Sequence, residues 1–145
     1  MRAALMMAKG ILEVGEIPDP RPLAGEALVE VDRAGICGSD LVTLADGRPK
    51  ELPRVLGHEF AGTLREIEGN TGYPFKPGDR VVAEPISGCG ICRSCRNGQY
   101  NVCDDRVILG VETDGVFAQY VRVPLENLLT IPGEMSFEEA ALVQP

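Results

Sequence analysis

Positive charge is scarce in this chain of 145 residues, which has 14 Lys and Arg against 22 Asp and Glu. The formal net charge is −8 and the isoelectric point is near 4.7. A nucleic acid would repel such a surface unless the basic residues were segregated, so we expect no nucleic-acid partner. No apolar run approaches the roughly 18 residues of a membrane-spanning helix, so we expect no membrane partner either.

Internal repeats and low-complexity linkers are also missing, and we expect no secretory signal. The first ten residues lack the hydrophobic region of a signal peptide and run directly into strand-like sequence, which favours a cytoplasmic protein. With 44% hydrophobic and 25% charged residues, the composition excludes a disordered tail or a fibrous repeat. The length is that of one globular domain with its own core.

Glycine and proline, in contrast, are plentiful: 17 Gly and 11 Pro are scattered along the chain. They punctuate many short elements and therefore favour a β-rich fold. Apolar and alternating stretches between them predict strands at 3–7, 11–17, 27–32, 60–67, 80–83, 116–123 and 127–131.

Two short helices are predicted as well. Ser39 and Asp40 can cap a helix that has Leu41, Leu44 and Ala45 on one face and ends at Gly47 and Pro49. The stretch 136–143 begins with Ser136 followed three residues later by Glu139, which is the capping-box signature of a helix start.

Four of the five cysteines lie within fifteen residues, at Cys89, Cys92, Cys95 and Cys103. Two successive C-x-x-C steps and a fourth Cys let one loop surround a single cation, and four thiolates make the closed tetrahedral shell of a structural zinc. Disulfides between such close cysteines would be strained, and unligated thiols would be prone to oxidation. Zinc is therefore preferred, while an iron–sulfur cluster remains open because the same thiolates bind it.

A second candidate site joins the fifth cysteine to the sole histidine. Taken singly, Cys37 is most simply a small buried residue and His58 a hydrogen-bonded core residue. Each, however, lies in a Gly-flanked turn at the end of a predicted strand, beside acidic residues, and Glu59 follows His58 directly. One sulfur, one imidazole nitrogen and one oxygen make an open zinc site whose remaining position can hold water or a substrate oxygen.

Several motifs, in this order along the chain, resemble those of the zinc-dependent medium-chain dehydrogenases: Gly57-His58-Glu59-Phe60-Ala61-Gly62, Lys76-Pro77-Gly78-Asp79-Arg80-Val81, the four-cysteine lobe and Gly115-Val116-Phe117-Ala118-Gln119-Tyr120-Val121. The resemblance covers nearly the whole chain. It implies their N-terminal catalytic domain, a mainly β GroES-like barrel with short helices and a four-cysteine zinc-binding lobe at about 86–104. It also implies that this domain spans 1–145, and that a Rossmann cofactor domain follows residue 145 and is absent from this chain.

Matched position by position, the resemblance makes Cys37 and His58 catalytic zinc ligands. Glu59 matches the acid that either ligates zinc or stands just behind it. Asp40 matches the carboxylate that orients the histidine, and Ser39 matches the hydroxyl that begins a proton relay. Gly38 after the cysteine resembles the polyol and sugar dehydrogenase branch of the family.

Gln144 departs from the commonest family pattern, because polyol-type relatives place a Glu before the corresponding Pro. A neutral amide oxygen is a weaker ligand than a carboxylate. Whether Glu59 or Gln144 completes the catalytic shell stays open at this point.

The function implied by the resemblance is the oxidation of an alcohol, polyol or sugar hydroxyl, with hydride transfer to NAD or NADP in the full-length protein. It implies one catalytic and one structural zinc, a homo-oligomer at full length, and no activity for residues 1–145 alone. The alternative is a zinc-stabilised binding module in which the lobe presents a loop to a partner while Cys37 and His58 are core residues.

Overall fold

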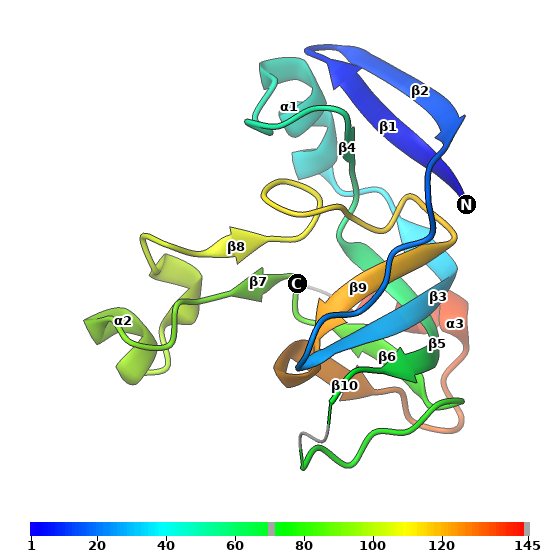
Figure 1. The fold of residues 1–145 in the computed structure, drawn as a ribbon, viewed down its shortest axis with the longest axis vertical. Helices are drawn as coiled ribbons and strands as arrows, with labels where there is room; N and C mark the ends of the chain where they lie inside the picture. Colours follow the sequence, from blue (N-terminus) through cyan, green and yellow to red (C-terminus); the bar gives the residue numbers. More distant parts are fainter. Residues whose placement is uncertain (70–71, 144–145) are drawn as a thin grey trace.

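The computed structural model describes residues 1–69 and 72–143, and most of their ordered elements are β-strands (Figure 1). The scattered Gly and Pro of the sequence predicted such a chain of short elements. The strands are β1 (Arg2–Ala8), β2 (Ile11–Glu16), β3 (Glu26–Gly35), β4 (Arg54–Val55), β5 (Glu59–Ile67), β6 (Arg80–Ala83), β7 (Ile86–Ser87), β8 (Val107–Ile108), β9 (Tyr120–Pro124) and β10 (Leu128–Thr130).

Short helices connect the strands: α1 (Gly38–Asp46), α2 (Arg93–Arg96) and α3 (Phe137–Ala140), with single 3-10 turns at Tyr100–Val102 and Leu125–Asn127. Among the described residues, no helix has the length and apolar character needed to cross a membrane. The expectation of a mainly β fold with short helices is confirmed.

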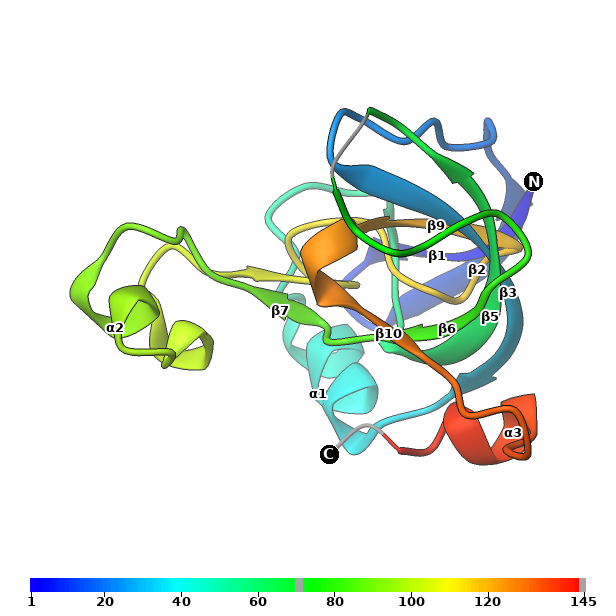
Figure 2. The ribbon, with the colours of Figure 1, turned by 90° about the horizontal axis from the view of Figure 1, so that it is seen from below.

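A five-stranded antiparallel sheet, in the order β10-β6-β5-β3-β9, forms the main body. Figure 2 shows these strands curving around a common interior. A smaller sheet, β2-β1-β4, closes one end, and a bridge between Ala3 and Ala118 ties it to the stretch before β9. Strand β3 pairs with both β5 and β9, so the residues that follow β3 and precede β5 are placed side by side.

The core fills the inside of the curved sheet because inward-facing residues alternate along the strands. In β3, for example, Ala27 and Val29 are fully buried, while their neighbours on either side are only half-buried. Full burial of a larger aliphatic side chain such as that of Val29 stabilises a fold by about 1.5–3 kcal/mol. The main cluster comprises Ala27, Val29, Phe60, Leu64, Val81, Ala83, Leu109, Val116, Val121, Val123, Leu125 and Leu128.

Helix α1 corrects two details of the sequence prediction. Its N-cap is Cys37 rather than Ser39 or Asp40, and Asp40 instead accepts a hydrogen bond from the backbone of that cap. The buried side chains of α1 are Asp40 and Thr43, whereas Leu41 is 63% exposed. The polar groups near the helix start therefore face the protein, whereas Leu41 and Ala45 of the predicted apolar face are exposed and Leu44 is half-buried.

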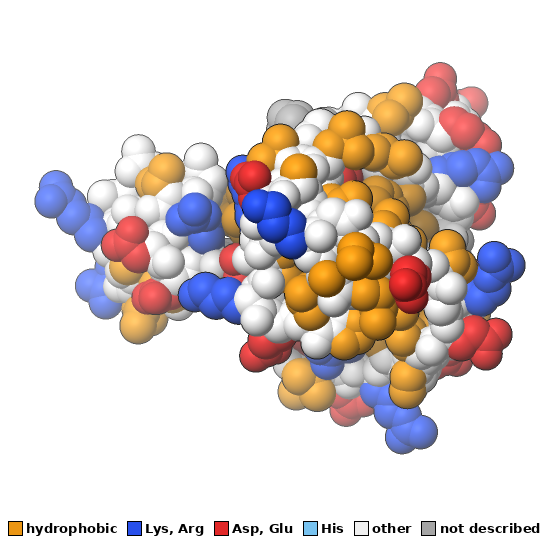
Figure 3. All heavy atoms as spheres, turned by 90° about the horizontal axis from the view of Figure 1, so that it is seen from above, with side chains coloured by type: hydrophobic (Ala, Val, Ile, Leu, Met, Phe, Trp, Pro, Cys, Tyr) orange, Lys and Arg blue, Asp and Glu red, His pale blue; other side chains and the backbone are white. Residues whose placement is uncertain are grey.

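This outward apolar face is part of a wider exposed surface. Figure 3 looks down on the end of the molecule that carries the β1–β2 hairpin and α1, and it shows hydrophobic side chains spread over the body. Exposed apolar residues at this end are Met7, Ile11, Leu12, Val14, Leu41 and Val42. The hairpin turn rests on the helix, because the Gly10 N–H donates to the Leu44 carbonyl over 2.8 Å.

The predicted strand at 116–123 is shorter in the structure, where β9 begins only at Tyr120. The residues before it pair elsewhere: the N–H groups of Val116 and Phe117 donate to the carbonyls of Gly57 and Leu56. This segment therefore runs across the loop before β5 instead of extending the five-stranded sheet.

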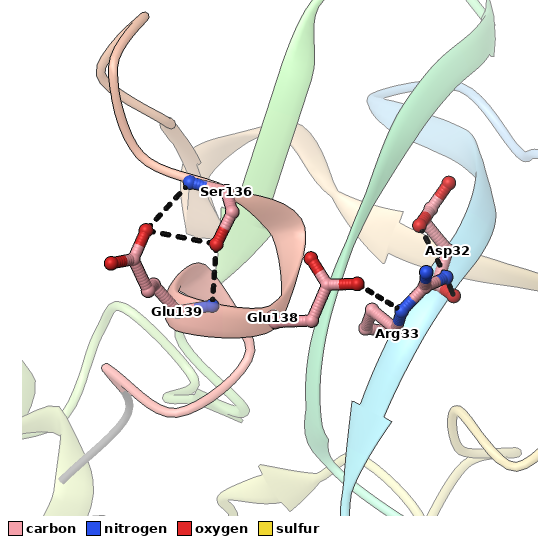
Figure 4. Close-up of polar contacts among 5 residues, drawn as sticks. All are labelled: Asp32, Arg33, Ser136, Glu138 and Glu139. Atoms are coloured by element: carbon pink, nitrogen blue, oxygen red, sulfur yellow. Dashed lines mark hydrogen bonds and ion pairs between the residues drawn. The ribbon is translucent and has the colours of Figure 1, made fainter.

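Helix α3 has the predicted capping box but ends at Ala140, earlier than the stretch to 143 suggested. Figure 4 shows the box: the Ser136 hydroxyl accepts from the Glu139 N–H over 3.2 Å, while the Glu139 carboxylate accepts from the Ser136 N–H over 2.9 Å. The neighbouring Glu138 bonds Arg33 of β3 at 2.8 Å. These contacts hold α3 against the end of the central sheet.

Candidate metal centres

The first ligand of the predicted catalytic site lies between β3 and α1. Cys37 has an extended backbone conformation, as an N-cap residue does, and its N–H donates to Asp40 Oδ2 over 2.9 Å. The Asp40 N–H in turn donates to the Cys37 carbonyl. Asp40 is 6% exposed, so a buried carboxylate fixes the loop that carries the cysteine.

The second ligand precedes β5 in a turn that requires glycine. Gly57 has a φ of +90°, and a Cβ on it would lie 2.6 Å from the Phe117 ring, so both its backbone conformation and its surroundings exclude a side chain. The Gly57 carbonyl accepts the Val116 N–H over 3.1 Å. The turn that carries His58 is thus hydrogen-bonded to Val116, in the segment that the sequence predicts to be part of a longer strand.

The imidazole of His58 is oriented by Asp40. His58 Nδ1 lies 3.1 Å from Asp40 Oδ1, which leaves Nε2 for another partner. This hydrogen bond raises the pKa of His58 from its ordinary 6.5 to about 8, against the opposing effect of burial. The Ser39 hydroxyl lies 3.4 Å from Nε2. The residues assigned to orientation and proton relay therefore border opposite ring nitrogens.

The three predicted ligand residues come together in space. One ligand atom from each of Cys37, His58 and Glu59 lies within 4.8 Å of the others, and all three residues are half-buried. A sulfur, an imidazole nitrogen and a carboxylate oxygen are donors that zinc accepts, and three protein ligands leave one position open. Gln144, the fourth candidate, lies outside the described residues.

The four-cysteine lobe projects as an arm from the body, with α2 near its tip (Figure 1). Ligand atoms of Cys89, Cys92, Cys95 and Cys103 all lie within 4.8 Å of one another. Cys92 Sγ and Cys103 Sγ are 3.8 Å apart. Two thiolates on a tetrahedron with zinc–sulfur bonds of about 2.3 Å lie about 3.8 Å apart, whereas a disulfide brings two sulfurs to about 2.05 Å.

The chemistry of these thiols also fits a cation. Backbone N–H groups of Ile91 and Cys92 lower the pKa of the Cys89 thiol to about 7, which favours a thiolate. Removal from water raises the pKa of the Cys95 thiol, and its hydrogen bonds with the other three cysteines raise it further, so a second negative charge here requires a counter-charge. A divalent cation among the four sulfurs would supply that charge.

The lobe contains almost no core of its own. Of residues 86–104, all of which the structure describes, Cys103 alone is buried, and apolar side chains such as Ile91 and Val102 are exposed. A loop without a hydrophobic core needs another source of stability, and a closed metal site provides it. The geometry is thus suited to the structural zinc that the cysteine spacing predicts.

The base of the lobe is anchored by Asn127, a residue that sequence reasoning missed. It is 7% exposed, and its Nδ2 donates to the carbonyls of Glu84 and Ile86 over 2.7 and 3.3 Å. Its Oδ1 accepts from the Ser87 hydroxyl over 3.3 Å. Nothing in the local sequence distinguishes this Asn from a surface residue, because its partners come from a segment about forty residues earlier.

A cavity of about 660 Å³ lies elsewhere, between the segment 17–21, β9 and the loop around Asp114. None of Cys37, His58 and Glu59 lines it. The half-buried residues of the candidate catalytic cluster therefore lie outside that cavity.

Comparison with known proteins agrees with this geometry. The alcohol dehydrogenase GroES-like domain family matches residues 23–133. The sorbitol dehydrogenase of Bacillus subtilis is 39% identical over 150 residues, covering 100% of this chain and 42% of the relative. The L-threonine 3-dehydrogenase of Pyrococcus horikoshii is 41% identical over 138 residues, covering 92% and 39%.

Solved structures give the same result. An alcohol dehydrogenase from Escherichia coli CFT073, complexed with NADH, has a TM-score of 0.90 at 36% identity and covers 98% of this chain and 41% of its own. The chain thus spans about two fifths of the length of the relatives that it matches. The chain belongs to the alcohol dehydrogenase GroES-like family of the zinc-dependent medium-chain dehydrogenases.

Proposed function

We propose that this chain is the catalytic domain of a zinc-dependent dehydrogenase that oxidises an alcohol, polyol or sugar hydroxyl with NAD or NADP. The observation that carries the proposal is the convergence of Cys37, His58 and Glu59 at the ends of two paired strands. The names of the relatives, sorbitol and L-threonine dehydrogenase, support a small substrate that carries a hydroxyl group.

Cys37 and His58 Nε2 would hold the catalytic zinc, with Glu59 or Gln144 as the oxygen ligand. Zinc bound there supplies a Lewis acid that lowers the pKa of a substrate hydroxyl. Asp40 keeps the imidazole in the tautomer that leaves Nε2 free for the metal. Ser39, beside that nitrogen, would accept the hydroxyl proton and pass it outward.

The remaining assignments follow from this role. Residues 1–145 form the catalytic domain, and the lobe at about 86–104 carries a second, structural zinc. A Rossmann domain after residue 145 would hold the nicotinamide that accepts the hydride. On this proposal the chain alone lacks activity, and the full-length protein is a homo-oligomer.

Metal analysis and kinetics of the full-length protein test the proposal. We expect two zinc ions per chain and reduction of NAD or NADP in the presence of alcohols, polyols or sugars. His58→Ala should abolish this turnover and retain the zinc of the lobe. A wild-type protein that reduces neither cofactor and holds only the lobe zinc would favour the binding module instead, whereas turnover that survives in His58→Ala would contradict the role of His58 alone.

A further inference from the structure

Gly35 occupies a position between the two ligand loops. It is the last residue of β3, two residues before Cys37, and it pairs with Glu59 at the end of the β3–β5 ladder. Side chains of directly opposed residues in an antiparallel pair lie on the same face of the sheet. The carboxylate of Glu59 therefore extends over the backbone of Gly35.

A side chain at position 35 would compete with that carboxylate for space. A Cβ on Gly35 would lie 2.5 Å from Glu59 Oε2, 3.2 Å from Glu59 Cβ and 3.6 Å from the Ala141 carbonyl oxygen. The carbonyl belongs to the end of α3, which the bonds of Glu138 to Arg33 and of the capping box hold in place. The side-chain oxygen of Glu59 is the one neighbour that can move easily.

The reason for glycine here is space and not backbone conformation. The φ of Gly35 lies outside the left-handed region that favours glycine, so alanine fits the backbone. Gly35 is also buried, which leaves no solvent-filled volume for a methyl group. The cost of alanine therefore falls mainly on the Glu59 carboxylate at 2.5 Å, and to a smaller extent on Glu59 Cβ at 3.2 Å.

We propose that Gly35 is a positioning residue for the catalytic metal site: its missing side chain provides the space in which the Glu59 carboxylate reaches the ligand cluster. A methyl group at this position turns the carboxylate away from Cys37 and His58. The site then loses its oxygen donor from β5 while the two other donors stay in place. This inference rests on the proposed function, because it assumes that the cluster binds a metal.

Cobalt substitution in the full-length protein tests the inference without using turnover. Co²⁺ in place of zinc gives d–d absorption that depends on the number and type of ligands. In the Cys37→Ala variant only the lobe binds Co²⁺, so its absorption spectrum is subtracted from that of each other variant. Gly35→Ala should change the remaining spectrum and lower the Co²⁺ affinity of this site at least about tenfold, as loss of a supporting group at a metal site does.

Gly133→Ala is the matched control, because Gly133 is exposed, its φ lies outside the left-handed region, and a Cβ on it would meet no atom within 4 Å. It should leave both spectrum and affinity unchanged. In a Glu59→Ala background, Gly35→Ala should have no further effect, since the carboxylate that it displaces is already gone. Equal effects of Gly35→Ala with and without Glu59 would overturn the inference.

The failure of the inference and that of the proposed function are distinguishable. A wild-type protein with no cobalt signal beyond that of the lobe contradicts the metal site itself. A normal wild-type signal that Gly35→Ala leaves unchanged contradicts the role of Gly35 alone. A Gly35→Ala protein that no longer unfolds cooperatively would also contradict it, because the methyl group is then disrupting the fold.

Discussion

Asp40 faces His58 across the gap between α1 and β5, with its Oδ1 3.1 Å from the imidazole Nδ1. Its other oxygen accepts the Cys37 N–H over 2.9 Å. One buried carboxylate therefore fixes both candidate ligands, the cysteine through the backbone of the helix cap and the histidine through its ring. Replacing it affects both loops together.

Asp40→Asn should lower the pKa of His58 in the metal-free protein from about 8 toward 6.5. Because the folded pKa is the higher one, the pair stabilises the wild type fully below the unfolded pKa of 6.5, and this contribution is lost as the pH rises through 8. It amounts to on the order of 2 kcal/mol. Urea unfolding should therefore separate variant and wild type more at about pH 6 than at about pH 9.

An NMR titration gives the pKa directly, because His58 is the sole histidine of residues 1–145. Ser39→Ala is the matched control: the hydroxyl lies 3.4 Å from the other ring nitrogen and carries no charge, so the pKa should stay near 8. If Asp40→Asn left the pKa of His58 unchanged, the carboxylate would not be its cause.

Cys95→Ser should remove the metal of the lobe and destabilise it. The lobe has almost no buried side chains, so loss of the closed site should lower the free energy of unfolding by about 4 kcal/mol or more. Elemental analysis and thermal melting measure the two effects.

His58→Ala and Cys37→Ala are the comparison variants for the lobe, because both lie in the open site. They should retain the zinc of the lobe and most of the thermal stability. Equal melting shifts in Cys95→Ser and His58→Ala would contradict the division into structural and catalytic metals. Iron with a visible charge-transfer band would overturn the choice of zinc.

Asn127→Ala should loosen the base of the lobe. It removes the Nδ2 donor from the carbonyls of Glu84 and Ile86, at a cost of about 1–3 kcal/mol in the free energy of unfolding. Chemical denaturation measures the loss. Asn101→Ala, at an exposed position of the lobe, should change stability by less than about 0.5 kcal/mol. A loss in Asn127→Ala of less than about 0.5 kcal/mol, as expected for Asn101→Ala, would contradict the role of Asn127 as an anchor.

Gln144→Glu tests whether Gln144, which lies outside the described residues, is a zinc ligand. If Gln144 ligates zinc, the site is more positive than in relatives with Glu, and a bound hydroxyl is more acidic. The variant should then shift the pH at which the rate rises to a higher value in the full-length enzyme. An unchanged pH profile together with unchanged zinc affinity would remove Gln144 from the site.

The sequence predicted both groups of candidate ligands, and the structure brings the described members of each group together. Cys37 and His58 come from separate loops and were matched through the family resemblance, whereas the four-cysteine lobe follows from a spacing that is local along the chain. Strand positions were mostly correct for a similar reason, since alternation along β3 reflects its inward and outward faces.

Hydrogen bonds between segments that are distant in the sequence explain the two predictions that the structure corrects. The sequence places Leu41 on an apolar face of the helix after Cys37, but the helix buries Asp40, because that carboxylate has partners in both ligand loops. The stretch before Tyr120 was expected to be a strand, but its N–H groups serve the loop around Gly57. Neither partner is visible within a window of neighbouring residues, and the same holds for the carboxylate that lies over Gly35.

On the proposed function, the pairing of Gly35 with Glu59 also makes metal uptake depend on correct folding of the sheet. The β3–β5 ladder contains two irregularities, between Leu28 and Val29 and between Val31 and Arg33, so its far end depends on how both are accommodated. A slip of one residue would turn Glu59 to the opposite face and separate Cys37 from His58. A chain with a misaligned sheet would therefore bind zinc poorly at this site. The fraction of chains with zinc bound there would then report how many have the correct register of β3 and β5.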